Sequence, residues 1–449
     1  MYLAYSLLLS LGLLVLIPHF LFQALAHGKY IAGLRQRLGS IPPVNDKRVI
    51  WLHCVSVGET QAARPLARRL QQQFPHHSLV VSTITRTGQN LAHDVFRNQV
   101  AGIFYFPFDW RWTARRALKT INPDAVLIME TELWPNFLRE CKARHIPVAL
   151  VNGRISRQSF RRYKLITFFL RRVLASLSIA VMQSEMDAER LETLGMPKER
   201  LFTAGNLKFD AEVAGDLTDK TEEIRARFGL DTGAPLILAA STHSNEEEIL
   251  VDAVKQLGQT TPVRLMIAPR HPERFKEVAA LIQQSGLSWT RRTNPPEPDD
   301  ANATVILLDT IGELPATYEL ANIVFVGGSI VDKGGHNVLE PAASGVAVVT
   351  GAHTHNFQTI VELMHEAHAI VQLPPLEGCA AGDEVAYTFA KLLENAEERA
   401  VLGRRARQLV IDNQGAANRT MELIAPLLSS NPRASSSSDS ILAANAHTS

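Results

Sequence analysis

The stretch Phe325-Val-Gly-Gly-Ser-Ile-Val-Asp-Lys-Gly-Gly-His-Asn-Val-Leu-Glu340 decides the fold class of this chain. It begins within an apolar run, Ile323–Val326, which is short, β-branched and followed by glycines, as is typical of a buried parallel strand. Two glycine pairs then allow sharp turns before a helix that we expect to start near Asn337. Amide groups at such a helix start suit a phosphate, and Glu340 suits sugar hydroxyls, so the stretch predicts a nucleotide-sugar site. The alternative is that the glycines only form tight turns in an α/β domain.

Length and composition restrict the class of protein. At 449 residues the chain is long enough for two domains of ordinary size plus appendages. Its 46 Lys and Arg nearly balance its 45 Asp and Glu, so a nucleic-acid partner is not indicated. The cysteines, Cys54, Cys141 and Cys379, match neither a zinc spacing nor a disulfide framework. We therefore expect small buried side chains in a reduced cytosolic setting.

The N-terminal segment is strongly apolar. Residues 1–26 contain no Asp, Glu, Lys or Arg, and Leu7–Ile17 is almost purely aliphatic. A helix of this length could cross most of a bilayer, or insert only shallowly because Pro18 and His19 interrupt it. Ala24-Leu-Ala26 also resembles a signal-peptidase site. Since basic residues follow the apolar run and none precedes it, the positive-inside rule favours an uncleaved anchor with the following chain in the cytoplasm.

From Val49 onward, short apolar runs alternate with amphipathic stretches, which predicts doubly wound parallel sheets. The first series of predicted strands is Val49–Cys54, Leu79–Thr83, Ile103–Phe106, Ala125–Met129, Val148–Asn152 and Ile179–Met182. The second series is Leu236–Ala240, Arg264–Ala268, Val305–Leu308, Ile323–Val326, Val346–Thr350 and Ala369–Val371. The predicted organisation is a membrane anchor at 1–26, an N-terminal Rossmann-like domain at 27–209, a connector at 210–235, a C-terminal Rossmann-like domain at 236–415, a last helix at 416–428 and a disordered tail at 429–449.

Two Rossmann-like domains would place a cleft at the carboxyl ends of both sheets, and polar residues of the first domain gather at such strand ends. Ser56-Val-Gly-Glu59 has the spacing of a helix capping box, and it would equally present Glu59 as a base. Glu130-Thr-Glu-Leu-Trp134 follows the fourth strand, where its carboxylates would meet a cation, a hydroxyl-rich ligand or a structural ion-pair partner. Lys208 could neutralise a departing phosphate, or it could pair with Asp210 at the surface.

Polar residues follow the strands of the second domain as well. Arg270 lies in Ala268-Pro-Arg-His271, where a guanidinium suits a phosphate or a carboxylate. His353 and His355 lack a carboxylate partner that would complete a metal site, so a polar lining is favoured over metal binding. The absence of a G-x-G-x-x-G motif after an early strand disfavours a dinucleotide oxidoreductase, and the sequence also lacks a P-loop lysine motif, G-x-S-x-G and H-E-x-x-H.

Taken together, these stretches resemble the Kdo (3-deoxy-D-manno-octulosonic acid) transferases of lipopolysaccharide synthesis. The matching motifs, in chain order, are Ser-Val-Gly-Glu59, Met-Glu130-Thr-Glu-Leu-Trp-Pro-Asn, Gly-Asn-Leu-Lys208-Phe-Asp, Pro269-Arg-His-Pro-Glu-Arg, Phe-Val-Gly-Gly-Ser and Gly-Gly-His-Asn337-Val-Leu-Glu340. The resemblance implies an α/β protein of GT-B architecture, with two Rossmann-like doubly wound domains, a central cleft and an N-terminal membrane-anchor helix. It implies an inverting transferase that moves Kdo from CMP-Kdo to the lipid A precursor (lipid IVA) and releases CMP, on the cytoplasmic face of the inner membrane.

The resemblance also implies roles for individual residues. Glu59 would be the general base, and Glu130 and Lys208 would stabilise the transition state. The predicted CMP-binding residues are Pro269, Arg270, Ile311, Gly312, Glu313, Asn337, Val338, Leu339 and Glu340. No cofactor and no metal is expected, and the implied partners are CMP-Kdo, the lipid A precursor and the inner-membrane surface. Two positions depart from the family pattern, which often has Gly in place of Asn245 and Pro in place of Val338.

Two other functions remain open at this point. The first is another GT-B transferase of envelope synthesis that uses a UDP-sugar. The second is a membrane-anchored, non-catalytic nucleotide-binding protein. Acidic groups on both sides of the expected cleft favour an enzyme, because a binding module has no need of them.

Overall fold

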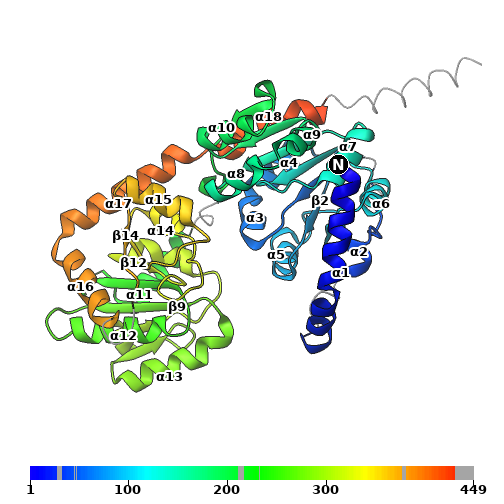
Figure 1. The fold of residues 1–449 in the computed structure, drawn as a ribbon. Helices are drawn as coiled ribbons and strands as arrows, with labels where there is room; N and C mark the ends of the chain where they lie inside the picture. Colours follow the sequence, from blue (N-terminus) through cyan, green and yellow to red (C-terminus); the bar gives the residue numbers. More distant parts are fainter. Residues whose placement is uncertain are drawn as a thin grey trace, which may run out of the picture. The chain divides into compact units, whose positions relative to one another are not determined.

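The computed structural model describes residues 1–27, 33–44, 46, 48–210, 217–231, 233–376 and 381–429, and of residues 16–27 it describes the backbone alone. The chain forms two compact units, shown in Figure 1. The first comprises Met1–Ala211 together with Gln414–Ser449, and the second comprises Glu212–Asn413. Apart from Ser429, the tail predicted to be disordered lies outside the described residues, as does Cys379, whereas Cys54 and Cys141 are buried free thiols.

The first unit is built on a seven-stranded parallel sheet with the strand order β3-β2-β1-β4-β5-β6-β7. Its strands are β1 (Val49–His53), β2 (Ser78–Thr83), β3 (Gly102–Tyr105), β4 (Ala125–Met129), β5 (Val148–Gly153), β6 (Ile179–Met182) and β7 (Leu201–Thr203). All residues of β1, β4 and β5 are buried, as expected when helices cover both faces of a parallel sheet. The six predicted strands are confirmed. The sequence missed β7, which is a three-residue edge strand without a single buried residue.

Helices cover both faces of this sheet. They are α1 (Tyr2–His27), α2 (Leu34–Arg37), α3 (Val57–Ala62), α4 (Arg64–Gln73), α5 (Arg86–Phe96), α6 (Arg111–Ile121), α7 (Pro135–Ala143), α8 (Arg157–Lys164), α9 (Thr167–Leu174), α10 (Glu185–Thr193) and α18 (Ala416–Ser429), with 3₁₀ turns η1 (Lys198–Arg200) and η2 (Leu207–Asp210). Helix α18 belongs to the core of this unit: its residues Met421 and Ile424 pack in one cluster with Leu66 and Leu70 of α4. The predicted last helix is therefore present, but as part of the first unit.

The second unit holds another seven-stranded parallel sheet, in the order β10-β11-β9-β8-β12-β13-β14. Its strands are β8 (Leu236–Thr242), β9 (Arg264–Pro269), β10 (Trp289–Arg291), β11 (Val305–Leu307), β12 (Ile323–Val326), β13 (Ala347–Thr350) and β14 (Val371–Gln372). Its helices are α11 (Thr218–Phe228), α12 (Glu246–Leu257), α13 (Phe275–Ser285), α14 (Leu339–Ser344), α15 (Gln358–Glu366), α16 (Ala381–Glu394) and α17 (Ala396–Asn413), with η3 (Pro272–Arg274), η4 (Pro298–Asn302) and η5 (Leu314–Leu320). Five of the predicted strands of this domain are confirmed, the sixth, Ala369–Val371, overlaps β14 only at Val371, and the sequence missed the short edge strand β10.

The connector predicted at 210–235 differs from the observed arrangement. Its helix, α11, packs into the second unit, where Ile224 and Phe228 are fully buried. The Thr221 hydroxyl donates to the carbonyl of Ala316 (2.9 Å), and Arg227 forms a buried ion pair with Asp300 (2.9 Å). The sequence suggested a linker because α11 is rich in charged residues, yet one side of this helix is apolar enough to be buried.

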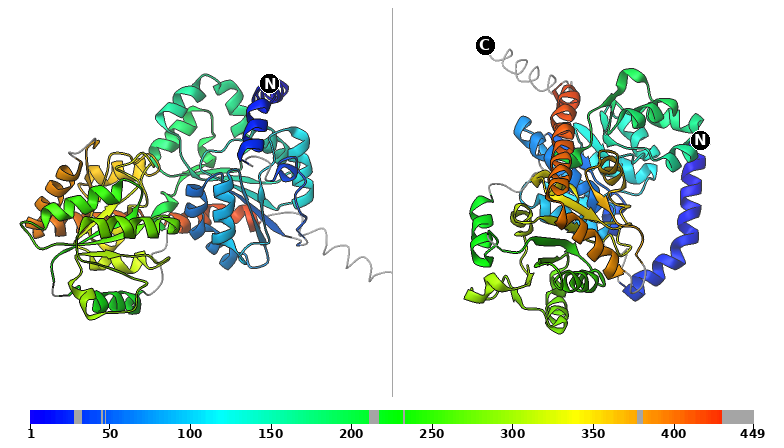
Figure 2. Two further views of the ribbon diagram at one scale, coloured as in Figure 1. Left: turned by 90° about the horizontal axis from the view of Figure 1, so that it is seen from below. Right: turned by 90° about the vertical axis from the view of Figure 1, so that its left-hand side faces the viewer.

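The N-terminal helix α1 lies along the surface of the first unit (Figures 1 and 2). Its inner side is aromatic and polar: Tyr2 contacts Phe169 with ring centroids 5.6 Å apart, and Ser6 and Ser10 accept hydrogen bonds from Asn136 and Trp110, each at 3.0 Å. The outer side exposes apolar residues, namely Leu3, Leu7, Leu8, Leu11, Leu14 and Val15. Within the described residues, no helix combines the length and apolar character needed to cross a membrane.

Candidate active site

Glu59 lies just after β1, at the edge of the first sheet where the strands end. The Ser56 side chain caps α3 and accepts from the Glu59 amide. The Val55 amide donates to Glu59 Oε2 (2.7 Å), and the Ser56 hydroxyl donates to Oε1 (3.1 Å). The two interpretations of Ser56-Val-Gly-Glu59 are therefore compatible, because the capping interactions hold the carboxylate at the strand end.

Two further carboxylates act on Glu59. Burial, then the charge of Glu130 and, more weakly, that of Glu132 raise the pKa of Glu59 to about 8, against the lowering effect of its hydrogen bonds. Burial and Glu130 also raise the pKa of Glu132. Glu130 has a left-handed backbone with φ of 52°, which is uncommon for a residue with a side chain. The structure thus brings the predicted acidic residues of the first unit together.

Lys208 belongs to the same cluster. Burial lowers the pKa of its ammonium, while the charges of Glu130 and Glu59 raise it and that of Arg154 lowers it further. Asp210, which the sequence offered as a surface partner for Lys208, accepts the amides of Gly415 (2.6 Å) and Ala417 (2.5 Å) at the start of α18. The three predicted catalytic residues therefore interact electrostatically within one unit.

The sequence did not single out a buried histidine at this edge. His53, the last residue of β1, is fully buried and stacks on Phe106 at 3.9 Å. Its Nδ1 lies 2.9 Å from the Ser82 hydroxyl, and burial lowers its pKa to about 3, so the ring is neutral. Among the described residues, neither His53 Nε2 nor Trp134 Nε1 finds a hydrogen-bond partner. A polar residue closing an otherwise apolar strand was the signal that could have revealed His53.

The predicted CMP-binding residues follow strands of the second unit, in separate local settings. Pro269 ends β9, and the exposed Arg270 after it is fixed through its backbone amide, which donates to the Thr242 carbonyl (3.0 Å). Ile311 is 81% exposed and Gly312 has a positive φ of 88°. Glu313 is held by Arg292 (2.9 Å) and Thr310 (2.7 Å), which help to keep its pKa below the usual value despite partial burial.

The remaining predicted CMP-binding residues surround the start of α14. This helix begins at Leu339, two residues after the expected start, and has only six residues. The side-chain Nδ2 of Asn337 donates to Glu340 Oε1 (3.0 Å), and the Tyr318 hydroxyl donates to Oε2 (3.2 Å). Val338 and Leu339 are buried. The Glu340 carboxylate is thus oriented by two side chains.

The first glycine pair, which was predicted only to allow a sharp turn, lies against a side chain that the sequence did not connect with it. The amides of Gly328 (2.7 Å), Ser329 (2.9 Å) and Ile330 (2.9 Å) all donate to the carboxylate of Glu246. These amides are therefore already used by a side chain and are not available to a phosphate. The sequence could not show this, because Glu246 lies more than 80 residues earlier in the chain.

Three histidines that the sequence did not connect lie close together after strands of the second sheet. They are His243 after β8, His271 after β9 and His336 after β12. The Nε2 atoms of His243 and His336 are 2.8 Å apart and their rings are stacked, with planes 4° apart. The ring of His271 stands edge-on to His243 at 5.2 Å. Burial, together with nearby cationic groups, lowers the pKa of both His243 and His336 to about 4, so both are neutral at pH 7.

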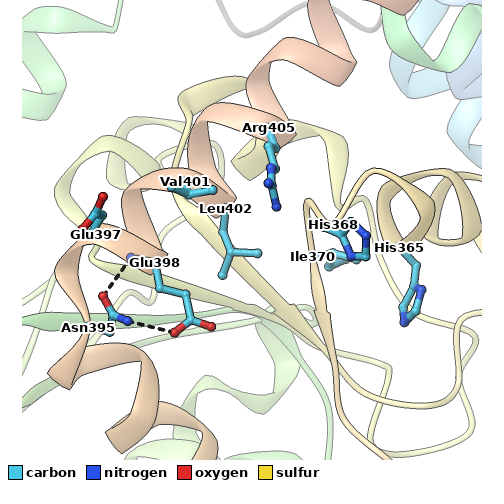
Figure 3. Close-up of a pocket in the computed structure, with 9 residues that line it drawn as sticks. All are labelled: His365, His368, Ile370, Asn395, Glu397, Glu398, Val401, Leu402 and Arg405. Carbon is cyan, nitrogen blue, oxygen red and sulfur yellow. Dashed lines mark hydrogen bonds between the residues drawn. The ribbon is translucent and has the colours of Figure 1, made fainter.

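A separate cavity of about 620 Å³ lies in the second unit, between α15 and the start of α17 (Figure 3). Its lining residues are His365, His368, Ile370, Asn395, Glu397, Glu398, Val401, Leu402 and Arg405. The Asn395 side chain accepts from the Glu398 amide (3.0 Å) and donates to its carboxylate (3.2 Å), as in a helix cap. None of the predicted site residues lines this cavity. In the part of the chain that the structure describes, no cluster of three His, Cys, Asp or Glu side chains could hold a metal ion.

A family model and two curated relatives all point to the same family. A family model described as 3-deoxy-D-manno-octulosonic-acid transferase (kdotransferase) matches residues 32–211. A 3-deoxy-D-manno-octulosonic acid transferase of Haemophilus influenzae is 36% identical over 90% of this chain and 93% of its own length. One of Bordetella pertussis is 31% identical over 86% of this chain and 89% of its own length.

A solved structure supports the fold. The crystal structure of a glycosyltransferase from Rickettsia africae matches 86% of this chain and 100% of its own, with a TM-score of 0.54 and 15% identity. Together with the two parallel sheets, this match supports the predicted GT-B-like fold class. At this identity it indicates the fold alone, whereas the two transferases above share enough sequence to define the family. The chain therefore belongs to the 3-deoxy-D-manno-octulosonic acid transferase family of enzymes.

Proposed function

We propose that this enzyme transfers Kdo from CMP-Kdo to a hydroxyl of the lipid A precursor in lipopolysaccharide synthesis, with Glu59 as general base. The observation that carries the proposal is the Glu59 carboxylate, which the Val55 amide and the Ser56 hydroxyl hold after β1, and whose pKa is raised to about 8 by burial and by the charge of Glu130. A base with a pKa close to the working pH combines a usable ionised fraction with a strong drive to take a proton. Such perturbed carboxylates are typical of catalytic sites.

The chemistry follows from these groups. Ionised Glu59 takes the proton of the acceptor hydroxyl while the acceptor oxygen bonds to the anomeric carbon of Kdo. The bond from that carbon to the CMP oxygen breaks on the opposite side, and CMP leaves with the electron pair, so the anomeric centre inverts. Glu130 would stabilise the oxocarbenium-like centre, and Lys208 the negative charge that develops on the leaving group.

The donor would be held by the predicted CMP-binding residues of the second unit. Pro269 and Arg270 follow β9, Ile311, Gly312 and Glu313 follow β11, and the other four precede or begin α14. In doubly wound sheets, ligands bind beyond the carboxyl ends of the strands, and each of these segments follows such an end. The guanidinium of exposed Arg270 is suited to the phosphate, and the oriented Glu340 carboxylate is suited to ribose hydroxyls.

We place the enzyme at the cytoplasmic face of the inner membrane. The apolar outer side of α1 has no protein partner among the described residues, and Leu165, Ile166 and Phe168 near it are exposed as well. Leu165 and Ile166 lie between α8 and α9, and the exposed basic residues of these two helices are Arg157, Arg161, Arg162, Lys164, Arg171 and Arg172. Apolar side chains with a basic surround suit an anionic lipid surface, where the lipid acceptor would also reside.

The first experiment measures transfer from freshly generated CMP-Kdo to the tetraacylated lipid A precursor in detergent micelles, with mass spectrometry to count the Kdo residues added. Transfer by the wild-type enzyme supports donor and acceptor together, and the configuration of the product tests inversion. Turnover of a UDP-sugar without any turnover of CMP-Kdo would favour another envelope transferase. Binding of CMP without any turnover would favour a non-catalytic nucleotide-binding protein.

A second experiment tests the membrane surface. The wild-type enzyme should sediment with vesicles containing anionic lipid and less with neutral vesicles. Replacing Phe168 and Leu165 by Ser should weaken this binding, because both side chains are more than two-thirds exposed (69% and 86%) and have no core role to lose. Binding that is indifferent to both lipid charge and these replacements would contradict the proposed surface.

A further inference from the structure

Glu246 stands out as a fully buried carboxylate that the proposed reaction does not use. It is the first residue of α12 and is 0% exposed. Oε2 accepts the amides of His243 (2.9 Å) and Gly328 (2.7 Å). Oε1 accepts the amides of Ser329 and Ile330, both at 2.9 Å. Four backbone donors therefore converge on one side chain.

This number of donors explains how a carboxylate can be buried here. Burial raises the pKa of Glu246, and the four amides lower it. Removing an ionised carboxylate from water without such partners would be strongly unfavourable. The position at the start of α12 adds a favourable interaction with the helix dipole.

The four amides come from two loops that follow adjacent strands. His243 follows β8, and Gly328–Ile330 follows β12, which pairs with β8. The chain needs glycine at 327, because a Cβ there would lie 2.8 Å from the Glu246 carboxylate and 2.7 Å from the Ser241 carbonyl. Gly328 has a positive φ of 68°. Glu246 thus connects the two loops through hydrogen bonds, and glycine at position 327 allows them to approach each other closely.

These two loops carry the imidazole pair. His243 is on the first loop, and His336 is on the segment that continues from the second. The Gly335 amide donates to the Gly328 carbonyl (2.7 Å), so the tied loop also fixes the segment just before Asn337. Arg270 is also connected to the first loop, because its backbone amide donates to the carbonyl of Thr242, the residue before His243.

We infer that Glu246 is a positioning residue for the donor site: its carboxylate sets the loops that place His243, His336 and the Asn337–Glu340 segment for CMP. This inference rests on the proposed function of that site. A glutamine cannot replace the carboxylate, because its NH₂ group would face backbone N–H donors and leave at least one pair of them without an acceptor.

The test compares Glu246→Gln with Glu247→Gln. Glu247 is the next residue of the same helix and is equally buried, but it pairs with Arg274 (2.7 Å) and makes none of the four bonds to the loops. Arg274 remains held by Glu277 (2.9 Å) in that variant. Both variants lose a buried charge, so a general loss of stability should affect both. Only Glu246→Gln should change the donor loops.

We expect Glu246→Gln to weaken CMP binding, measured by calorimetry, and to raise KM for CMP-Kdo, each by about tenfold or more, with a smaller effect on kcat at saturating donor. A tenfold loss is the size expected for one misplaced hydrogen-bonded group. Hydrogen exchange of the amides at 328–330 should accelerate in Glu246→Gln and not in Glu247→Gln. Glu246→Asp, which keeps the charge on a shorter side chain, should fall between the wild type and Glu246→Gln.

Equal CMP affinity and equal KM in the two glutamine variants would overturn the positioning role, and faster exchange without a change in CMP affinity would do the same. These outcomes differ from a failure of the proposed function. In that case the wild-type enzyme itself would neither bind CMP nor use CMP-Kdo.

Discussion

Two buried glutamates occupy comparable places in the two units and have different chemistry. Glu59 follows β1 at the start of α3, and Glu246 follows β8 at the start of α12. Each accepts a backbone amide from three or four residues earlier in the chain. Glu246 accepts three more amides, whereas Glu59 receives only one hydroxyl and faces Glu130 and Glu132.

The difference between the two glutamates shows that the number and charge of its partners decide whether a buried carboxylate is free to take a proton. Four donors occupy Glu246 on both oxygens, so little is left for a substrate proton. Burial and two like charges, opposed by only two donors, leave Glu59 with a pKa of about 8. The position after the first strand is the same in the two units, and the partners brought by the rest of the fold decide the role.

The largest effect should come from Glu59→Gln. Loss of a general base lowers kcat by about 10²–10⁴-fold, and the transfer assay measures this directly. Activity close to that of the wild type would keep the enzyme's function but remove Glu59 from the role of base.

The stability of the same variant provides the control. The folded-state pKa of Glu59, about 8, lies above its unfolded value of 4.5, so folded Glu59 keeps a proton that the unfolded chain loses between these values. Native stability therefore falls as pH rises through this window, and glutamine removes that loss. Above pH 8 the Tm of Glu59→Gln should match or exceed that of the wild type. A clear decrease would mean that the lost activity reflects misfolding.

The pH dependence of the wild-type enzyme tests the contrast next. If ionised Glu59 is the base, kcat/KM should rise with pH and reach half of its upper value near pH 8. The rise should disappear from the residual activity of Glu59→Gln. A midpoint near the ordinary glutamate value of 4.5 would show that the neighbouring carboxylates do not act on Glu59 as described.

Glu132→Gln should shift this midpoint to lower pH. The charge of Glu132 raises the pKa of Glu59, so removing it favours ionisation. Activity above the midpoint should change little, since Glu132 is not assigned to the chemistry. Glu185→Gln, at an exposed position in the same unit, is the control and should leave the midpoint unchanged. A shift to higher pH would reverse the inferred sign.

Ser56→Ala should produce the smallest change, in the opposite direction. The Ser56 hydroxyl donates to Glu59 and lowers its pKa, so its loss should move the midpoint to higher pH. The variant also loses the cap of α3, at a cost of about 1 kcal/mol. Ser156→Ala removes the comparable cap of α8, and urea unfolding should show a similar loss with no shift in the pH profile. Identical profiles for the two variants would mean that Ser56 acts only as a cap.

The sequence by itself determined the two parallel sheets. Apolar, β-branched runs such as Ile323–Val326 are stable only when both faces are covered, so they mark central strands without further context. The edge strands β7 and β10 were not predicted, because each has only three residues at the margin of a sheet and lacks such an apolar run. The capping motif around Glu59 could also be recognised from the sequence, because capping is a local interaction between residues close in the chain.

Only the tertiary structure decided which partner each polar group meets. Glu246 bonds amides more than 80 residues away, His243 meets His336 across 93 residues, and α18 returns to the first unit across more than 200. Hydrogen bonds and charges act over a few ångströms in space, whatever the separation along the chain. The sequence therefore indicated which residues could do chemistry, and folding determined which neighbours they meet: like charges at Glu59, the proposed base, and four backbone amides at Glu246.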